Sequence, residues 1–405
     1  MIDLKRESLE LHKRHRGKLE VVPKVPLGNS QDLSLAYSPG VAVPCLHIAD
    51  DGTKAYDYTV KGNLVAIATN GTAVLGLGDI GPLASLPVME GKAALFKSFG
   101  GVDAVPICLD SKSTDDIVFA LTLLSPTFGG INLEDIAAPQ CFEIEERLKR
   151  SCDIPVFHDD QHGTAIVTAA GLINALRIVG KTLDRVRIVV NGAGAAGIAT
   201  VDLLHAMGAA DIVLCDTNGI VYEGRPNGMN PVKARVATIT NPRGLRGALR
   251  DAVREADVFI GVSAAGALHP DMLRSMAPGA IVFALANPDP EIMPEEAKRA
   301  GAVVVATGRS DYPNQINNVL AFPGVFRGAL DVRAAEINEA MKMAAVYAIA
   351  GLIAEPELRA DYVVPAPFDP RVAESVAVAV ASAALETGCA RAALPEEEIV
   401  RRIRR

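Results

Sequence analysis

Short apolar runs alternate with amphipathic stretches in the first half of the chain, a pattern typical of βαβ units. The predicted strands span 102–109, 130–133 and 154–157, and the predicted helices between them span 114–124 and 138–149. Strands joined by a crossover helix run parallel, so their carboxyl ends should meet at one edge of a sheet. Upstream, the runs 64–69 and 73–77 flank Asn70-Gly71 and predict a β-hairpin, and residues 3–16 predict an amphipathic helix.

A glycine-rich segment follows the buried strand predicted at 186–190. It opens a helix at 198–207, and the next strand, 212–215, ends at Asp216. Glycines let the backbone approach a pyrophosphate at a helix N-terminus, and an acid at the end of the second strand accepts hydrogen bonds from a ribose. The segment consists of Gly192, Ala193, Gly194, Ala195, Ala196 and Gly197. Together these features predict a dinucleotide site.

The pattern then continues with strands and ends in long helices. Strands are predicted at 257–262, 280–286 and 302–307, and helices at 163–180, 333–353 and 371–386. The predicted fold class is α/β: a doubly wound, Rossmann-type nucleotide domain plus an α/β substrate- and metal-binding domain on which the C-terminal helices pack back. The expected domain boundaries give residues 1–162, 163–331 and 332–405.

Composition narrows the classes of function. A net charge of −8 argues against a nucleic-acid surface. The longest apolar stretch noted, 376–385, is shorter than the roughly 18 residues needed to span a membrane. The N-terminus lacks the apolar region of a signal peptide, and the six cysteines form no C-x-x-C pair. A cytoplasmic protein with reduced thiols is expected.

Two pairs of acids end neighbouring predicted strands. Glu134-Asp135 follows one strand and Asp159-Asp160 follows the next, so four carboxylates should crowd at one sheet edge. They would repel one another unless a cation neutralises them, and oxygen ligands favour Mg²⁺ or Mn²⁺ over zinc. His158 and His162 flank the second pair and are rival ligands for a softer metal.

Three further features have a structural as well as a chemical interpretation. Lys92 falls on or near the apolar side of the helix predicted from Met89; it is a general base if burial brings its pKa toward neutrality, or a surface lysine. Tyr37, in a turn beside Pro39, is a candidate acid or a packed side chain. The amide-rich loop 312–318 suits carboxylate or carboxamide binding, or is an ordinary Asx-turn loop.

At this point the sequence resembles the malic enzymes, specifically the small bacterial type, over nearly its whole length. The motifs that carry the resemblance occur in order: Ala36-Tyr37-Ser38-Pro39-Gly40, Gly91-Lys92, Leu133-Glu134-Asp135, His158-Asp159-Asp160-Gln161-His162-Gly163-Thr164, Asn317-Asn318 and Phe322-Pro323-Gly324.

The resemblance implies roles for these residues. Tyr37 is the general acid and Lys92 the general base, while Glu134, Asp135 and Asp160 are the divalent-metal ligands, with Asp159 beside them. Thr164 contacts the cofactor, and Asn287 and Asn318 contact substrate or nicotinamide. The implied reaction is oxidative decarboxylation of L-malate to pyruvate and CO₂ with reduction of NAD or NADP, in a homodimer or higher homo-oligomer. The charge of Asp216 favours NAD.

One departure from the larger malic enzymes concerns substrate binding. Where those enzymes place an arginine that grips a malate carboxylate, this chain has Thr72-Ala73-Val74. The metal and amides, or another residue, would have to hold the C1 carboxylate.

Three alternatives remain open from the sequence. A malolactic-type or oxaloacetate-decarboxylating enzyme would use the same metal and nicotinamide without net reduction. A non-catalytic nucleotide sensor would keep the fold without needing Tyr37, Lys92 and the ligand set together. A two-domain amino-acid dehydrogenase would need no metal.

We expect Lys92→Ala to reduce turnover by about 10²–10⁴-fold, the range for loss of a positioned base, while nucleotide binding stays largely intact. Steady-state rates and a nucleotide titration of the same preparation measure both. Unchanged turnover would contradict the assignment of Lys92 as the base.

Overall fold

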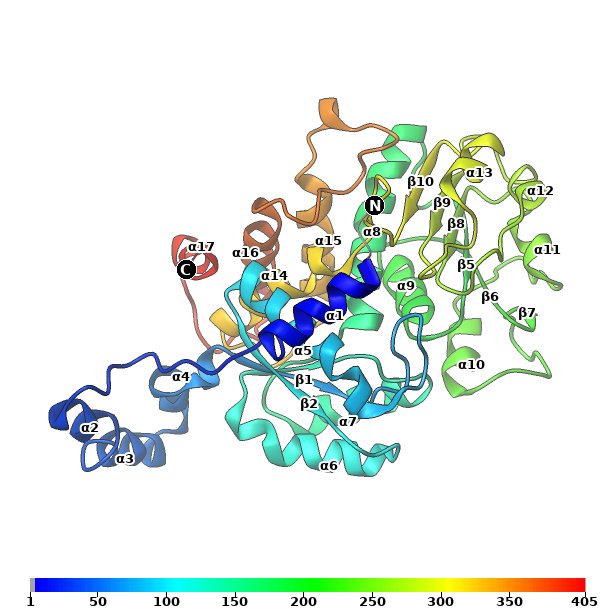
Figure 1. The fold of residues 1–405 in the computed structure, drawn as a ribbon. Helices are drawn as coiled ribbons and strands as arrows, with labels where there is room; N and C mark the ends of the chain where they lie inside the picture. The colour runs from blue at the N-terminus through cyan, green and yellow to red at the C-terminus, as the bar shows by residue number, and fades with distance from the viewer. Residues whose placement is uncertain (1–3, 405) are drawn as a thin grey trace.

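The computed structural model describes residues 4–404 and contains two largely parallel β-sheets (Figure 1). The first sheet has the strand order β2-β1-β3-β4, and all its pairings are parallel. The predicted βαβ pattern is therefore confirmed. Its strands are β1 (Leu64–Thr69), β2 (Asp103–Cys108), β3 (Gly130–Leu133) and β4 (Val156–His158).

Both faces of the first sheet are covered by helices. Alternate residues of β1 point to opposite faces, so they join two different groups of core residues. Val65 and Ile67 belong to the large core that includes α5 (Gly81–Gly100), whereas Ala66 and Ala68 pack with α6 (Thr114–Leu124) and α7 (Gln140–Ser151). A buried parallel strand needs apolar residues on both faces, which explains the continuous run in β1.

The second sheet has the order β10-β9-β8-β5-β6-β7, parallel except for the β6–β7 pair. The chain reverses its winding between β5 and β8, which is where doubly wound sheets bind ligands. The strands are β5 (Arg187–Asn191), β6 (Asp211–Asp216), β7 (Gly219–Ile220), β8 (Val258–Gly261), β9 (Ile281–Ala284) and β10 (Val304–Thr307). The flanking helices are α9 (Ala195–Ala206), α10 (Pro231–Ala237), α11 (Leu249–Val253), α12 (Pro270–Leu273) and α13 (Pro294–Arg299). The predicted Rossmann-type α/β class is confirmed.

One helix, α8 (Asp159–Val179), leads from β4 into the second sheet. By length and apolarity it is the one described helix that could cross a membrane, but 67% of its apolar window is buried inside the protein. It is therefore a buried core helix. By length and composition it resembles a membrane span more than the segment 376–385 does. Because α8 begins at Asp159, it starts before the boundary predicted at residue 162, and the proposed domain limits stay a prediction.

The C-terminal helices pack back toward the first sheet, as expected, but the direct contacts begin with α14 (Phe322–Asp331), ahead of the start predicted at residue 332. Phe322 and Phe326 lie with ring centroids 4.6 and 5.2 Å from that of Phe96 on α5, and Phe326 is also 5.8 Å from Phe157 on β4. These aromatic contacts join α14 to the edge of the sheet that carries the acids. The helices are α14 (Phe322–Asp331), α15 (Glu339–Gly351), α16 (Arg371–Glu386) and α17 (Glu396–Ile403).

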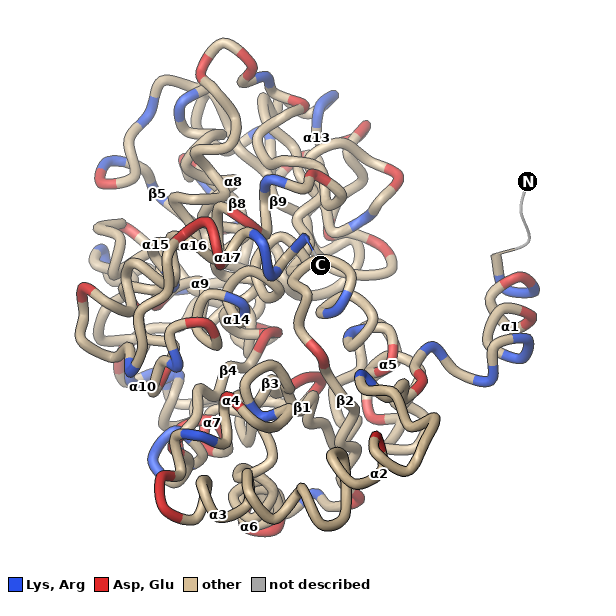
Figure 2. Tube along the Cα trace, turned by 90° about the vertical axis from the view of Figure 1, so that its left-hand side faces the viewer, with Lys and Arg blue, Asp and Glu red and all other residues tan. Residues whose placement is uncertain are grey.

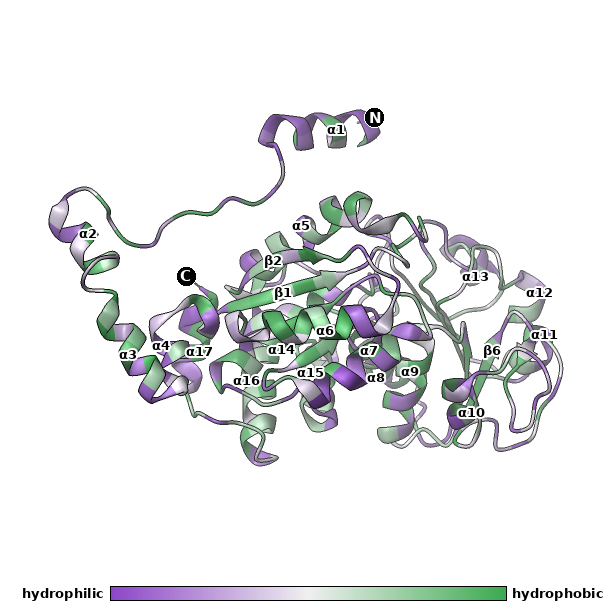
Figure 3. Cartoon of the chain, turned by 90° about the horizontal axis from the view of Figure 1, so that it is seen from below, coloured by the Kyte–Doolittle hydropathy of each residue, from purple (hydrophilic) through white to green (hydrophobic). Residues whose placement is uncertain are grey.

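The N-terminal arm, residues 4–50, leaves the body of the molecule. It contains α1 (Leu4–His15), α2 (Ser30–Ala36) and α3 (Ala42–Asp50), and none of these helices has a buried residue. Figure 3 shows α2 and α3 extending beyond α4 (Ala55–Tyr58), and Figure 2 shows α1 standing apart, with basic and acidic residues interspersed over the whole trace. Residue 3, part of the predicted first helix, lies outside the described residues.

The predicted hairpin at Asn70-Gly71 is wrong. β1 hydrogen-bonds to β2 on one side and β3 on the other, so it has no free edge for a returning strand. Gly71 instead has φ +67°, and its carbonyl accepts hydrogen bonds from Ile80 and Gly81, which turns the chain into α5. Local turn propensity was overridden by the tertiary pairing of β1.

Candidate active site

A buried lysine on α5 meets the acids at the carboxyl edge of the first sheet. The Lys92 side chain donates a 2.9 Å hydrogen bond to Glu134 Oε1, contacts Asp159 Oδ2 and lies 4.0 Å from the Phe322 ring centroid. Lys92 is 8% exposed, and Asp159 is fully buried. The parallel sheet thus brings residues from three separate segments into one cluster, as the sequence predicts.

The charge on Lys92 depends on its carboxylate partners. Burial alone lowers its pKa, but the charges and hydrogen bonds of Asp159 and Glu134 outweigh burial and raise the pKa above its usual value. The predicted burial is confirmed. The role of Lys92 as a general base stays a prediction.

The neighbouring acids show the crowding that the sequence predicts. Burial, followed by the negative charge of Asp160, raises the pKa of Asp135 to about 7. Burial also raises the pKa of Glu134 well above its usual range, with Asp160, Asp159 and Asp135 adding to the effect and Lys92 opposing it. Negative charge is therefore costly at this edge unless a cation balances it.

The donor set fits a hard divalent cation. Asp135 Oδ2 is buried without a hydrogen-bond partner, and Asp160 keeps 32% of its side chain exposed while accepting a 2.7 Å hydrogen bond from the Asp135 N–H. Asp135 also has φ +53°, an uncommon backbone conformation for a residue other than glycine. Within residues 4–404, no three Asp, Glu, His or Cys side chains form a ready-made ligand set, so the acids would have to move together around an ion.

The histidines that flank Asp159 and Asp160 have different surroundings. His162 Nε2 lies 2.8 Å from Glu145 Oε1, and burial lowers the pKa of His162 to about 4 even though Glu145 opposes that shift. His158 is fully buried, and its Nε2 lies 3.4 Å from Asp160 Oδ2. His162 is thus already engaged by a carboxylate.

An amide from the C-terminal half completes the cluster. Asn318 Nδ2 donates a 3.0 Å hydrogen bond to Asp159 Oδ2, and Thr164 Oγ1 donates a 3.1 Å bond to Asn318 Oδ1. Gly163 is required beside them, because a Cβ there would lie 1.9 Å from Asp159 Oδ1. Asn287 follows β9, where its side chain donates to the Leu285 carbonyl at 3.1 Å.

The glycine-rich loop has the geometry expected of a phosphate site. Gly192 has φ +119°, a Cβ on Gly197 would lie 1.7 Å from the Gly192 carbonyl oxygen, and nothing lies within 4 Å of a Cβ built on Gly194. Gly194 caps α9 without a side-chain hydrogen bond. The first N–H groups of α9, at Ala195 and Ala196, therefore stand at an open backbone surface.

Asp216 lies where predicted, at the end of β6, but its carboxylate is already bound. Arg225 donates to both oxygens, at 2.8 and 2.5 Å, and Lys233 Nζ lies 2.6 Å from Oδ2. Burial raises the pKa of Asp216, but these hydrogen bonds outweigh it and bring the pKa down to about 2. Two cations against one carboxylate leave one net positive charge.

Tyr37 is the one proposed catalytic residue that the chain does not bring to this cluster. It follows α2 in the N-terminal arm, is 70% exposed, and its backbone hydrogen bonds reach only Leu33 and Val41. Figure 1 shows α2 well away from α5.

Four residues with clear contacts to the site were missed from the sequence. Asn132 donates a 2.8 Å hydrogen bond to Glu134, Glu145 binds His162, and Arg225 and Lys233 bind Asp216. Asn132 on β3 lies two residues before Glu134, which directly follows the strand, so strand periodicity places both on the same face. The others depend on packing between elements and had no local signal.

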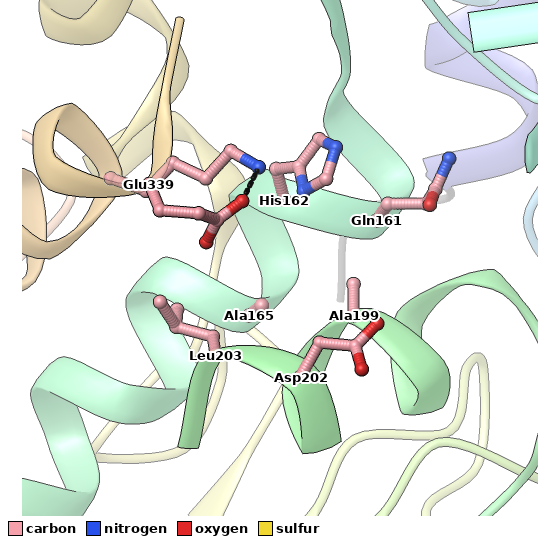
Figure 4. Close-up of a pocket in the computed structure, with 8 residues that line it drawn as sticks. Gln161, His162, Ala165, Ala199, Asp202, Leu203 and Glu339 are labelled. Atoms are coloured by element: carbon pink, nitrogen blue, oxygen red, sulfur yellow. Dashed lines mark hydrogen bonds and ion pairs between the residues drawn. The ribbon is translucent and has the colours of Figure 1, made fainter. Parts of the chain in front are cut away.

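A small cavity of about 60 Å³ lies between α8, α9 and α15 (Figure 4). Gln161 and His162 line it from α8, Ala199 and Asp202 from α9, and Lys342 from α15. Lys342 pairs with Glu339 at 2.7 Å.

A dinucleotide-binding loop beside an acidic cluster with a buried lysine defines an α/β oxidoreductase with a candidate cation site. Residues 16–149 match the family description "Malic enzyme, N-terminal domain", and residues 161–385 match "Malic enzyme, NAD binding domain". The chain belongs to the malic enzyme family.

Individual relatives agree with this assignment. The chain is 64% identical to a Bacillus subtilis protein named bifunctional malic/malolactic enzyme, covering 100% of this chain and 98% of that one. It is 56% identical to an NAD-dependent malic enzyme of Geobacillus stearothermophilus, covering 93% and 78%. The crystal structure of a malic enzyme from Pyrococcus horikoshii superposes with a TM-score of 0.94 at 48% identity, covering 99% and 95%.

Proposed function

We propose that this chain catalyses oxidative decarboxylation of L-malate to pyruvate and CO₂, with reduction of NAD or NADP. The observation that carries the proposal is the meeting of buried Lys92 with Glu134 and Asp159 at a sheet edge, in a chain that also carries an open dinucleotide loop. A protein that only bound nucleotide would not need this cluster, whose buried charges are costly to remove from water.

Lys92 is the group that removes the proton of the malate C2 hydroxyl, which it can do as the free amine once a cation balances the charge of Glu134. As the C2–H hydrogen leaves as hydride for oxidised NAD or NADP, C2 becomes a carbonyl, and the C3–C4 bond then breaks to release CO₂. The electron pair of that bond forms the enolate of pyruvate, which needs a proton at C3. Tyr37 delivers that proton.

Glu134, Asp135 and Asp160 would hold a Mg²⁺ or Mn²⁺ ion. When bound, such an ion supplies Lewis acidity toward the C2 oxygen and balances the crowded carboxylates. Asp159 keeps its contacts with Lys92 and Asn318 and holds both side chains in place. All three ligands would bind through carboxylate oxygens, which these metals prefer.

Amides take the place of the arginine that is missing at Thr72-Ala73-Val74. Asn318 is oriented by its hydrogen bonds with Thr164 and Asp159. Asn287 follows β9 and lies beside the turn at Gly76, since a Cβ built on Gly76 would be 3.5 Å from Pro288, the next residue in the chain. Asn287 and Asn318 are therefore placed to donate to malate carboxylates or to the nicotinamide carboxamide. The loop Gly192–Gly197, together with Thr164, holds the dinucleotide.

A second copy of the chain supplies Tyr37. The N-terminal arm exposes apolar side chains that a free monomer would leave in water, with Leu35 at 71% and Leu46 at 69% exposed. In a two-fold dimer each arm reaches the other body, so both sites are completed by the same exchange. This arrangement explains why Tyr37 lies far from Lys92 within one chain.

Either nicotinamide cofactor is accepted. The sequence favoured NAD because a free Asp216 would repel a 2′-phosphate, but Arg225 and Lys233 occupy that carboxylate and leave a net positive charge. A positive site tolerates or attracts a phosphate. Relatives of both kinds exist, including an NADP-dependent malic enzyme of Rhizobium meliloti that is 55% identical over 95% of this chain, which spans about half of that protein.

A malolactic reaction is a second candidate activity, favoured by the name of the Bacillus subtilis relative. In that reaction the hydride taken from malate returns to pyruvate within the same site, which gives lactate and CO₂ with no net reduction.

The proposed location is the cytoplasm. A reducing compartment of this kind suits the six free cysteines.

We expect L-malate with Mn²⁺ to produce reduced nicotinamide and pyruvate, and EDTA to abolish both. Absorbance of the reduced cofactor and an assay for pyruvate measure the reaction, and added Mn²⁺ after EDTA is the control. Lactate without reduced cofactor would favour the malolactic activity instead. No product of either kind, despite nucleotide binding, would contradict the proposed function.

Co-expressed Tyr37→Phe and Lys92→Ala chains should regain activity that neither variant has alone. Random pairing gives half mixed dimers, each with one complete site, so about a quarter of wild-type activity is expected. Separate tags on the two chains allow the mixed dimer to be isolated and assayed. A mixed dimer as inactive as the single variants would show that Tyr37 does not act across the interface.

Lys233→Ala should raise the KM for NADP by about 10–100-fold while changing the KM for NAD little, because one charge-assisted contact to a phosphate is worth roughly 1.5–3 kcal/mol. Steady-state kinetics with both cofactors measure the effect. Lys298→Ala, on the exposed helix α13, is the control. An equal change for both cofactors would contradict a role at the 2′ position.

A further inference from the structure

Glu145 is a buried carboxylate on α7 that none of the proposed catalytic steps uses. It is 5% exposed and accepts hydrogen bonds from the His158 N–H at 3.3 Å, from Gln161 Nε2 at 3.2 Å and from His162 Nε2 at 2.8 Å. Lys149, one turn further along α7, lies 2.8 Å from it. One side chain therefore collects four donors.

Three of these donors lie immediately on either side of the two aspartates. His158 precedes Asp159, and Gln161 and His162 follow Asp160, so Glu145 fixes the backbone and side chains around the pair without touching either acid. A buried hydrogen-bond group that loses its partner costs about 1–3 kcal/mol, so this attachment restrains the first turn of α8 strongly.

A cavity of about 60 Å³ borders the same turn at Gln161 and His162 and is lined there by Ala165, Ala199 and Lys342 (Figure 4). The His162 ring also lies 5.3 Å from that of Phe157. Side-chain packing thus leaves space beside these two residues, and their hydrogen bonds to Glu145 hold them in place.

We propose that Glu145 is a positioning residue that holds the His158–His162 turn so that Asp160 faces the divalent cation and Asp159 faces Lys92. The inference rests on the proposed metal-dependent function, which it deepens. It assigns a role in metal affinity to a residue on a helix that contributes no ligand. Residues of this kind typically change metal affinity by about 10–100-fold when they are replaced.

The test compares Glu145→Gln with Glu143→Gln in the full-length protein. Glu143 is on the same helix but has 60% of its side chain exposed, in an ion pair with Arg147. The Mn²⁺ dissociation constant is measured from the electron paramagnetic resonance signal of free Mn²⁺, without turnover, beside nucleotide affinity and thermal unfolding. Asp160→Ala serves as the reference for loss of a ligand.

We expect Glu145→Gln to weaken Mn²⁺ binding about tenfold or more, with nucleotide affinity unchanged, and Glu143→Gln to match the wild type. His162→Leu, which removes one donor but keeps an apolar contact with Phe157, should weaken Mn²⁺ binding in the same direction and decides the question if Glu145→Gln does not fold.

Two other outcomes would overturn the inference, for different reasons. A lower melting temperature with unchanged Mn²⁺ affinity, while Asp160→Ala loses Mn²⁺, would show that Glu145 only stabilises the fold and would leave the proposed function standing. Absence of Mn²⁺ binding by the wild type would remove the metal site and the positioning role together.

Discussion

The contact of Lys92 with Glu134 and Asp159 is the interaction on which the rest of the site depends. It joins three segments, α5, the end of β3 and the start of α8, that are distant in the sequence. Its charges are almost wholly removed from water, so each is stable only with the others in place, and loss of one partner would leave an uncompensated buried charge. The parallel sheet makes this arrangement possible because it brings strand ends to one edge.

The surroundings of this contact follow from it. The Phe322 ring of α14 lies 4.0 Å from the Lys92 ammonium, and Gly163 leaves room for the Asp159 carboxylate. Asn318 links the same carboxylate to a segment that follows the second sheet. The two halves of the molecule therefore meet at the charged cluster, and the C-terminal helices have to pack on the first sheet for it to form.

The sequence predicted this edge well because strand ends, paired acids and a glycine-rich turn are local features. It predicted the burial of Lys92, but not its two carboxylate partners, which lie 42 and 67 residues away in the chain. Asp216 was placed correctly and interpreted too simply, because Arg225 and Lys233 reach it from 9 and 17 residues further along. The hairpin prediction failed because a turn sequence does not show that the strand before it already pairs with other strands on both sides. The position of Tyr37 on an exposed N-terminal arm, away from Lys92 within one chain, had no local signal in the sequence.

The helix α8 has a consequence beyond its role as a connector. Its 21 residues make a rod about 30 Å long, with Asp159 and Asp160 in its first turn and its flank against α9, which the phosphate loop opens. A rigid rod shifted at one end moves at the other. If the dinucleotide displaces α8, the free energy of coupling must appear equally in the affinity for the cation, because linkage is reciprocal. The dinucleotide and the cation would then change each other's affinity by the same factor through one helix.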